Sequence, residues 1–137
     1  KIDTIFSVGG DTKISSSSSL ISSYKTISEK RPWGNFEILY QSSGYKIKIL
    51  KIFPKEQISF QKHDYRDEYW TIVEGNGRFY LDDKVESVTT GSSFSIQRNQ
   101  VHSIENISKK NLVIIEVQIG DYLSEKDIHR LKDKYER

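Results

Sequence analysis

The polar run QKHDYRDEYW, residues 61–70, lies between two segments that have the composition of β-strands, Ile58 to Lys62 and Glu68 to Val73. Gln61 and His63 are two residues apart, and side chains at this spacing on a strand share one face. An amide and an imidazole can therefore both point into the interior of a barrel, close to the carboxylate of Glu68. The run predicts a β-structure that carries polar ligands on an inner face.

A second polar group follows Gly91 and includes His102. Together, Gln61, His63, Glu68 and His102 offer an amide oxygen, two imidazoles and a carboxylate, a set that suits zinc or another divalent first-row ion. The chain has no cysteine, so any metal must be held by nitrogen and oxygen ligands. We therefore interpret these four residues as a candidate metal site.

Short alternating segments divided by turn residues extend on both sides of the run and predict an all-β sandwich or barrel. The further predicted strands are Phe36 to Tyr40, Tyr45 to Phe53, Arg78 to Leu81, Lys84 to Thr89, Ser93 to Ile96, His102 to Ile107 and Leu112 to Gln118. Charged and apolar residues alternate from Tyr45 to Ile52, and we interpret the lysines there as a solvated strand face.

The two ends of the chain differ from this pattern. Residues 1–30 are rich in serine and have the composition of a linker or N-terminal arm, so we place the barrel domain at residues 31–137. Near the other end, Ser124 resembles a helix N-cap, and Ile128, Leu131 and Tyr135 recur at helical spacing. We expect one C-terminal α-helix lying on the barrel.

The spacing of the polar residues resembles the two cupin motifs, G-x5-H-x-H-x4-E-x6-G and G-x5-P-x-G-x2-H-x3-N. In this register Gln61 takes the first histidine position, while His63, Glu68 and His102 take the other ligand positions. The chain departs from the motifs at three places, Lys55, Gln97 and Asn99. The resemblance implies a cupin-type double-stranded β-helix, which is a jelly-roll barrel.

A longer resemblance covers residues 31–137 and points to the cupin module of type II mannose-6-phosphate isomerases, which is often fused behind a mannose-1-phosphate guanylyltransferase. The matching segments are Arg31 to Gly34, Ser59 to His63, Arg66 to Trp70, His102 to Asn106, Glu116 to Gly120, Tyr122-Leu123, Asp127-Ile128 and Asp133 to Arg137. The resemblance implies a zinc-dependent interconversion of mannose 6-phosphate and fructose 6-phosphate, with Gln61, His63, Glu68 and His102 as the ligands. Asp64, Tyr65 and Tyr69 stand where that family commonly has histidines.

Isomerisation between an aldose and a ketose needs a base and a group that stabilises negative charge on oxygen. Arg66 is our candidate for charge stabilisation or for a bidentate grip on phosphate. The base stays open among Glu116, Glu105, Asp64 and Tyr65, because spacing cannot show hydrogen-bond reach. Further candidates for phosphate binding are Lys48, Arg98, Arg130 and Arg137.

The composition limits the classes of partner. The 21 basic and 19 acidic side chains are spread without a block of like charge, so we expect no nucleic acid as a partner. No apolar run approaches the ~20 residues of a membrane helix, and we expect a soluble, cytoplasmic protein that binds a phosphorylated sugar. Exposed sheet edges in such barrels favour a homodimer.

Two other functions fit the same barrel. The departures at Asp64 and Tyr65 motivate a related sugar-nucleotide isomerase or epimerase. A non-catalytic cupin that binds a sugar, or that serves as a dimerisation module for a fused nucleotidyltransferase, would need no turnover at all. Fold alone does not decide among these three.

Overall fold

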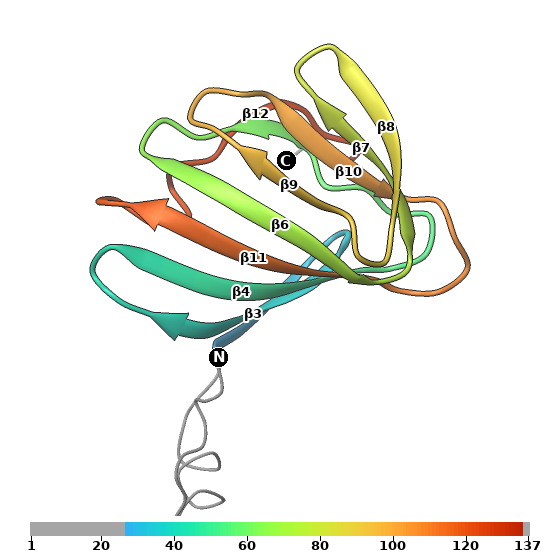
Figure 1. Cartoon of the computed structure of the whole chain (residues 1–137), viewed down its shortest axis with the longest axis horizontal. Coiled ribbons are helices and arrows are strands. Elements are labelled where there is room, and N and C mark those ends of the chain that lie inside the picture. Colours follow the sequence, from blue (N-terminus) through green and yellow to red (C-terminus); the bar gives the residue numbers. More distant parts are fainter. Residues whose placement is uncertain (1–26, 136–137) are drawn as a thin grey trace, which may run out of the picture.

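Two antiparallel β-sheets face each other in the computed structural model, which describes residues 27–135 (Figure 1). The first sheet has the order β2-β3-β4-β11-β6-β9 and the second has the order β12-β5-β10-β7-β8. The strands are β2 (Ile27–Arg31), β3 (Gly34–Gln41), β4 (Tyr45–Ile52), β5 (Phe60–Lys62), β6 (Arg66–Glu74), β7 (Asn76–Leu81), β8 (Lys84–Thr89), β9 (Ser93–Ile96), β10 (His102–Asn106), β11 (Leu112–Gly120) and β12 (His129–Lys132). The all-β expectation is confirmed.

The core lies between the two sheets and is built from apolar side chains at alternate strand positions. Trp70 and Ile72 on β6 face Phe79 on β7 and Ile104 on β10, and all four are 2% exposed or less. Burial of side chains this large supplies most of the driving force for closing the two sheets. This apolar core fills the middle of the structure, and polar inward-facing residues gather toward one end of it.

The alternation in β4 has the opposite orientation to the one we predicted. Lys46 and Lys48 are buried, whereas Ile47 and Ile49 are only half-buried. The interpretation of the lysines as a solvated face is therefore wrong. A period of two shows which residues share a face but not which face is inside, and here a carboxylate partner inside the barrel compensates the buried charge.

The expected C-terminal helix is also wrong. No helix occurs in residues 27–135, and hence none there could cross a membrane. The segment instead forms β12, which pairs antiparallel with β5 at the edge of the five-stranded sheet. Ser124 does begin a turn, since its carbonyl oxygen accepts the N–H of Asp127. Pairing with β12 satisfies the backbone groups on the open edge of β5, which a helix lying on the barrel would leave unpaired.

The N-terminal boundary differs slightly from the expected one. Residues 27–30 belong to β2, which pairs with β3 and extends the first sheet. The remainder of the predicted linker or arm, residues 1–26, lies outside the described residues, as does Arg137. The homodimer and the cytoplasmic location remain predictions.

Candidate metal centre and adjoining pocket

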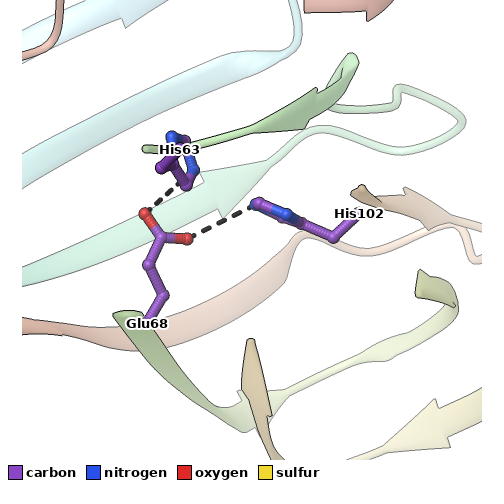
Figure 2. Close-up of side chains that lie close together, drawn as sticks. All are labelled: His63, Glu68 and His102. Atoms are coloured by element: carbon purple, nitrogen blue, oxygen red, sulfur yellow. Dashed lines mark ion pairs between the residues drawn. The ribbon is translucent and has the colours of Figure 1, made fainter. Parts of the chain in front are cut away.

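Three buried side chains from three different segments converge at one end of the barrel (Figure 2). His63 directly follows β5, Glu68 lies on β6 and His102 begins β10. The Nε2 atom of His63 is 3.1 Å from Glu68 Oε2, and the Nε2 atom of His102 is 3.5 Å from Glu68 Oε1. All three side chains are 2% exposed or less. The carboxylate thus lies between two imidazole nitrogens in a site closed to bulk water.

Backbone carbonyls set the tautomer of both histidines. The Nδ1 atom of His63 is 2.7 Å from the carbonyl oxygen of Asp127, and that of His102 is 3.0 Å from the carbonyl oxygen of Gln100. A carbonyl can only accept a hydrogen bond, so each neutral ring carries its proton on Nδ1. Each Nε2 atom therefore presents a lone pair to the centre of the site, the arrangement that a metal-binding histidine requires.

The unpaired atoms of this cluster fit a divalent cation. His63 Nε2, Glu68 Oε1 and His102 Nε2 are buried, and none has a hydrogen-bond partner among the described residues. A buried polar atom without a partner costs about 1–3 kcal/mol. Three such atoms around one point are explained if a cation binds there, and two imidazoles with a carboxylate suit zinc or another first-row metal.

Gln61 faces the same site. Its Cα is paired with that of His102 on β10 and with that of Arg130 on β12, and directly paired residues of neighbouring strands point to the same side of a sheet. The side chain lines the pocket beside the cluster, with Ser59 Oγ donating to its Oε1 at 3.5 Å. Its role as a fourth ligand remains a prediction.

Arg66 supplies a fixed positive charge to the cluster. Its Nε donates to Glu68 Oε2 at 2.8 Å, and a second nitrogen donates to the carbonyl oxygen of Ser124 at 3.1 Å. Burial alone would raise the pKa of Glu68, but the neighbouring His63, His102 and Arg66 hold it well below its usual range. Glu68 is thus an anion, as a metal ligand should be.

Glu116 is a second buried carboxyl group. Its environment raises its pKa, whereas that of Glu68 is lowered. It lies on β11 opposite Trp70 on β6, whose indole N–H donates to Glu116 Oε2 at 3.1 Å. Burial, followed by the negative charge of Glu68, raises the pKa of Glu116 to about 7. A carboxyl group with this pKa can either accept or donate a proton near neutral pH.

A small pocket adjoins the cluster, with a cavity of about 40 Å³. The residues that shape its chemistry are Trp33, Lys48, Gln61, Arg66, Glu116 and Glu125. Arg31 and Arg130 also line it. Cations, carboxyl groups and an indole ring around one space are suited to a small polar anion rather than to a long polymer.

Several predicted site residues lie elsewhere. Glu105 does not line the pocket, because its carboxylate contacts Arg78 and Tyr80, each at 3.2 Å. Arg98 is also outside it, with its Nε 3.9 Å from Asp67 and its side chain 47% exposed. Tyr65 packs edge-on against the Tyr122 ring. Glu105 and Tyr65 are thus poor candidates for the base, and Arg98 is a poor candidate for phosphate binding.

Asp64 also points away from the pocket. One of its carboxylate oxygens is 2.9 Å from His129 Nε2, and Asp127 lies next to them. These three residues could hold a metal by their spacing. The carboxylate of Asp127, however, accepts the backbone N–H groups of Asp64 and Tyr65 at 2.9 and 3.0 Å. Its role is therefore to fix this loop.

Three buried or partly buried residues beside this site were missed by sequence reasoning. We assigned Lys46 to a solvated strand face, and we assigned Glu125 and Asp127 to the start of a helix. The signal available for Lys46 was its position two residues before Lys48, a candidate for phosphate binding, since both must share a face. No local signal distinguishes the roles of Glu125 and Asp127, because both depend on where the C-terminal segment returns to the barrel.

The family model and the similar proteins that match this chain point to one family. The model of the family described as "Mannose-6-phosphate isomerase C-terminal" matches residues 20–133. Mannose-1-phosphate guanylyltransferase 2 of Escherichia coli O157:H7 is 39% identical over 105 residues, covering 77% of this chain and 22% of the relative. Alginate biosynthesis protein AlgA of Pseudomonas aeruginosa is 38% identical over 107 residues, covering 78% and 22%. The chain thus spans about a fifth of the length of these relatives.

Solved structures with little sequence identity share the fold. A conserved protein from Klebsiella pneumoniae with a double-stranded β-helix domain has a TM-score of 0.63 at 13% identity, covering 71% of this chain and 83% of that one. The cupin domain of Cnp3 from Schizosaccharomyces pombe has a TM-score of 0.62 at 14% identity, covering 74% and 72%. The expected cupin-type double-stranded β-helix is therefore confirmed, without the helix.

Proposed function

The chain belongs to the mannose-6-phosphate isomerase C-terminal family, and we propose on that premise that it is a metal-dependent isomerase that interconverts mannose 6-phosphate and fructose 6-phosphate. The observation that carries the proposal is the cluster of three buried, unpaired ligand atoms on His63, Glu68 and His102. Two imidazole nitrogens and a carboxylate that converge on one buried point are the arrangement that a metal site requires.

His63, Glu68 and His102, with Gln61 beside them, would hold the cation, most simply Zn²⁺ given nitrogen and oxygen donors. When bound, the metal would act as a Lewis acid on the carbonyl and hydroxyl oxygens of the sugar. Glu68 keeps its negative charge beside the buried cation of Arg66, whose Nε donates to Glu68 Oε2 at 2.8 Å.

Glu116 is the best-placed candidate for moving the proton between C1 and C2 of the sugar. It lines the same pocket as Gln61 and Glu68, and its raised pKa of about 7 suits a group that must both take and return a proton. The Trp70 indole N–H, at 3.1 Å, fixes the orientation of this carboxyl group. Arg66, buried next to Glu68, would stabilise negative charge that develops on the sugar oxygens.

The departures from the family pattern do not alter the pocket. Asp64 pairs with His129, and Tyr65 and Tyr69 are 54% and 42% exposed. None of the three lines the pocket beside the cluster. The sugar-nucleotide alternative was motivated by these positions, so their location outside the pocket favours the hexose phosphate.

One experiment addresses metal and activity together. Purified protein would be analysed for bound metal, and turnover of mannose 6-phosphate would be followed by NMR with added zinc or cobalt. We expect stoichiometric metal and conversion in the wild type, and the loss of both in His63→Ala. His129→Ala is the matched control, because this histidine is exposed and lies outside the three-residue cluster. Binding of the sugar phosphate without turnover at saturating metal would favour the non-catalytic alternative instead.

A further inference from the structure

Two lysine ammonium groups are buried on the inner face of β4. The side chains of Lys46 and Lys48 are 5% and 4% exposed, and both approach one carboxylate oxygen of Glu125. Lys48 donates a hydrogen bond to this oxygen, while Lys46 lies 3.9 Å from it and donates to the carbonyl oxygen of Leu123 at 2.6 Å. Buried charges are costly unless each is well paired, and here two cations share one anion.

The charges around the pocket leave an excess of positive charge. Arg66 is already paired with Glu68, and Glu125 is the carboxylate that both lysines approach within 4 Å. Burial, followed by the charge of Lys48, lowers the pKa of Lys46, as expected when one carboxylate serves two ammonium groups. An additional anion at this point would therefore be stabilised.

Glu125 can leave this position without unfolding the segment that carries it. Its side chain is 29% exposed, so it borders on solvent. The backbone on either side is fixed separately, by Arg66 at the Ser124 carbonyl and by the buried carboxylate of Asp127. Rotation of one side chain is then enough to uncover the two lysines.

The cavity is too small for a sugar phosphate while Glu125 lies in it. Its volume of about 40 Å³ is far below the roughly 300 Å³ or more of ligand pockets. A phosphate group carries up to about two negative charges and three acceptor oxygens. It can therefore satisfy both lysines where a single carboxylate oxygen cannot.

We propose that Lys46 and Lys48 form the binding subsite for the phosphate group of the substrate, and that Glu125 occupies this subsite in the ligand-free protein and is displaced when the substrate binds. The identification of the anion as the phosphate of a sugar rests on the function proposed above. The presence of an anion subsite rests only on the buried lysines and their shared carboxylate.

The test measures the affinity of the full chain for inorganic phosphate by isothermal titration calorimetry, without added metal. Glu125→Gln removes the competing charge at almost constant volume, and we expect phosphate to bind about tenfold more tightly, equivalent to roughly 1.4 kcal/mol. Lys48→Met and Lys46→Met should each weaken binding about tenfold or more. Glu56→Gln and Lys134→Met are matched controls, because Glu56 is similarly exposed and pairs with Lys134 away from the pocket. Both controls should leave the affinity unchanged.

Equal or weaker phosphate binding by Glu125→Gln would overturn the displacement by Glu125, and unchanged binding by both lysine variants would overturn the subsite. The result is independent of the isomerase assay. If the wild type shows no turnover while Glu125→Gln still gains affinity for phosphate, the isomerase function fails and the subsite remains. If turnover is found but the KM for mannose 6-phosphate is unchanged in both lysine variants, the function remains and the subsite fails.

Discussion

The Nδ1 atom of His63 lies 2.7 Å from the backbone carbonyl oxygen of Asp127, so the segment before β12 sets the orientation of a candidate metal ligand 64 residues earlier in the chain. The carboxylate of Asp127 strengthens this link by accepting the N–H groups of Asp64 and Tyr65, the two residues that follow the histidine. The C-terminal segment is therefore part of the support of the metal centre.

Replacing Asp127 with alanine should weaken both metal binding and the fold. Alanine keeps the backbone carbonyl that accepts from His63 but loses the carboxylate that holds this carbonyl in place. Disturbing the support of a ligand histidine typically costs 10–100-fold in metal affinity, and two freed backbone N–H groups cost about 1–3 kcal/mol each if they stay buried. A competition titration with a zinc chelator would measure the first effect, and urea unfolding of the metal-free protein the second. Asp121→Ala, an exposed position on the same segment, serves as the control. Unchanged zinc affinity in Asp127→Ala would show that His63 needs no such support.

Glu116→Gln should reduce kcat by about 10²-fold or more, the usual contribution of a general acid or base. Metal content should remain at the wild-type level, because Glu116 is not one of the three converging ligands. Glu105→Gln is the informative comparison, since sequence alone left both carboxyls as candidates and only Glu116 lines the pocket. A steady-state assay with metal analysis decides the assignment. A larger loss of kcat in Glu105→Gln than in Glu116→Gln would reverse it.

Arg66→Met should destabilise the metal-free protein strongly. The substitution leaves the carboxylate of Glu68 buried without its cation, and breaking a buried pair in this way costs about 3–5 kcal/mol. Saturating zinc should restore a large part of the loss, because the cation replaces the missing positive charge beside Glu68. Urea unfolding of both proteins, with and without zinc, measures this rescue. If zinc raises the free energy of unfolding by the same amount in wild type and variant, the metal does not compensate for the missing charge of Arg66.

The parts of this structure that follow local rules were predictable from sequence. The strand from Ser93 to Ile96 has the predicted bounds, since alternation and turn residues define it locally. His63, Glu68 and His102 were recognised by their spacing, and the barrel brings them together. The spacing of Lys46 and Lys48 shows that they share a face, but their inward orientation depends on Glu125 from a distant segment and was not predictable from local alternation. The fate of residues 124–135 was missed for a related reason, since their helical spacing competes with an open edge on β5.

Acid should remove a stabilising contact of the C-terminal segment at Glu56. The hydroxyl of Tyr135 and the ammonium of Lys134 both donate to its Oε1, and these hydrogen bonds, that of Tyr135 first, lower the pKa of Glu56. Because the folded pKa lies below the unfolded one, the contribution is complete above pH ~4.5 and is lost as the pH falls through the folded pKa. The pair is largely solvated, so its contribution to the free energy of unfolding should be below about 1 kcal/mol.

Glu56→Gln should therefore lower Tm by a few degrees at pH 7 and by almost nothing at pH 3, as measured by thermal unfolding followed by circular dichroism. A Tm difference that is as large at pH 3 as at pH 7 would assign the effect to packing rather than to the charge of Glu56.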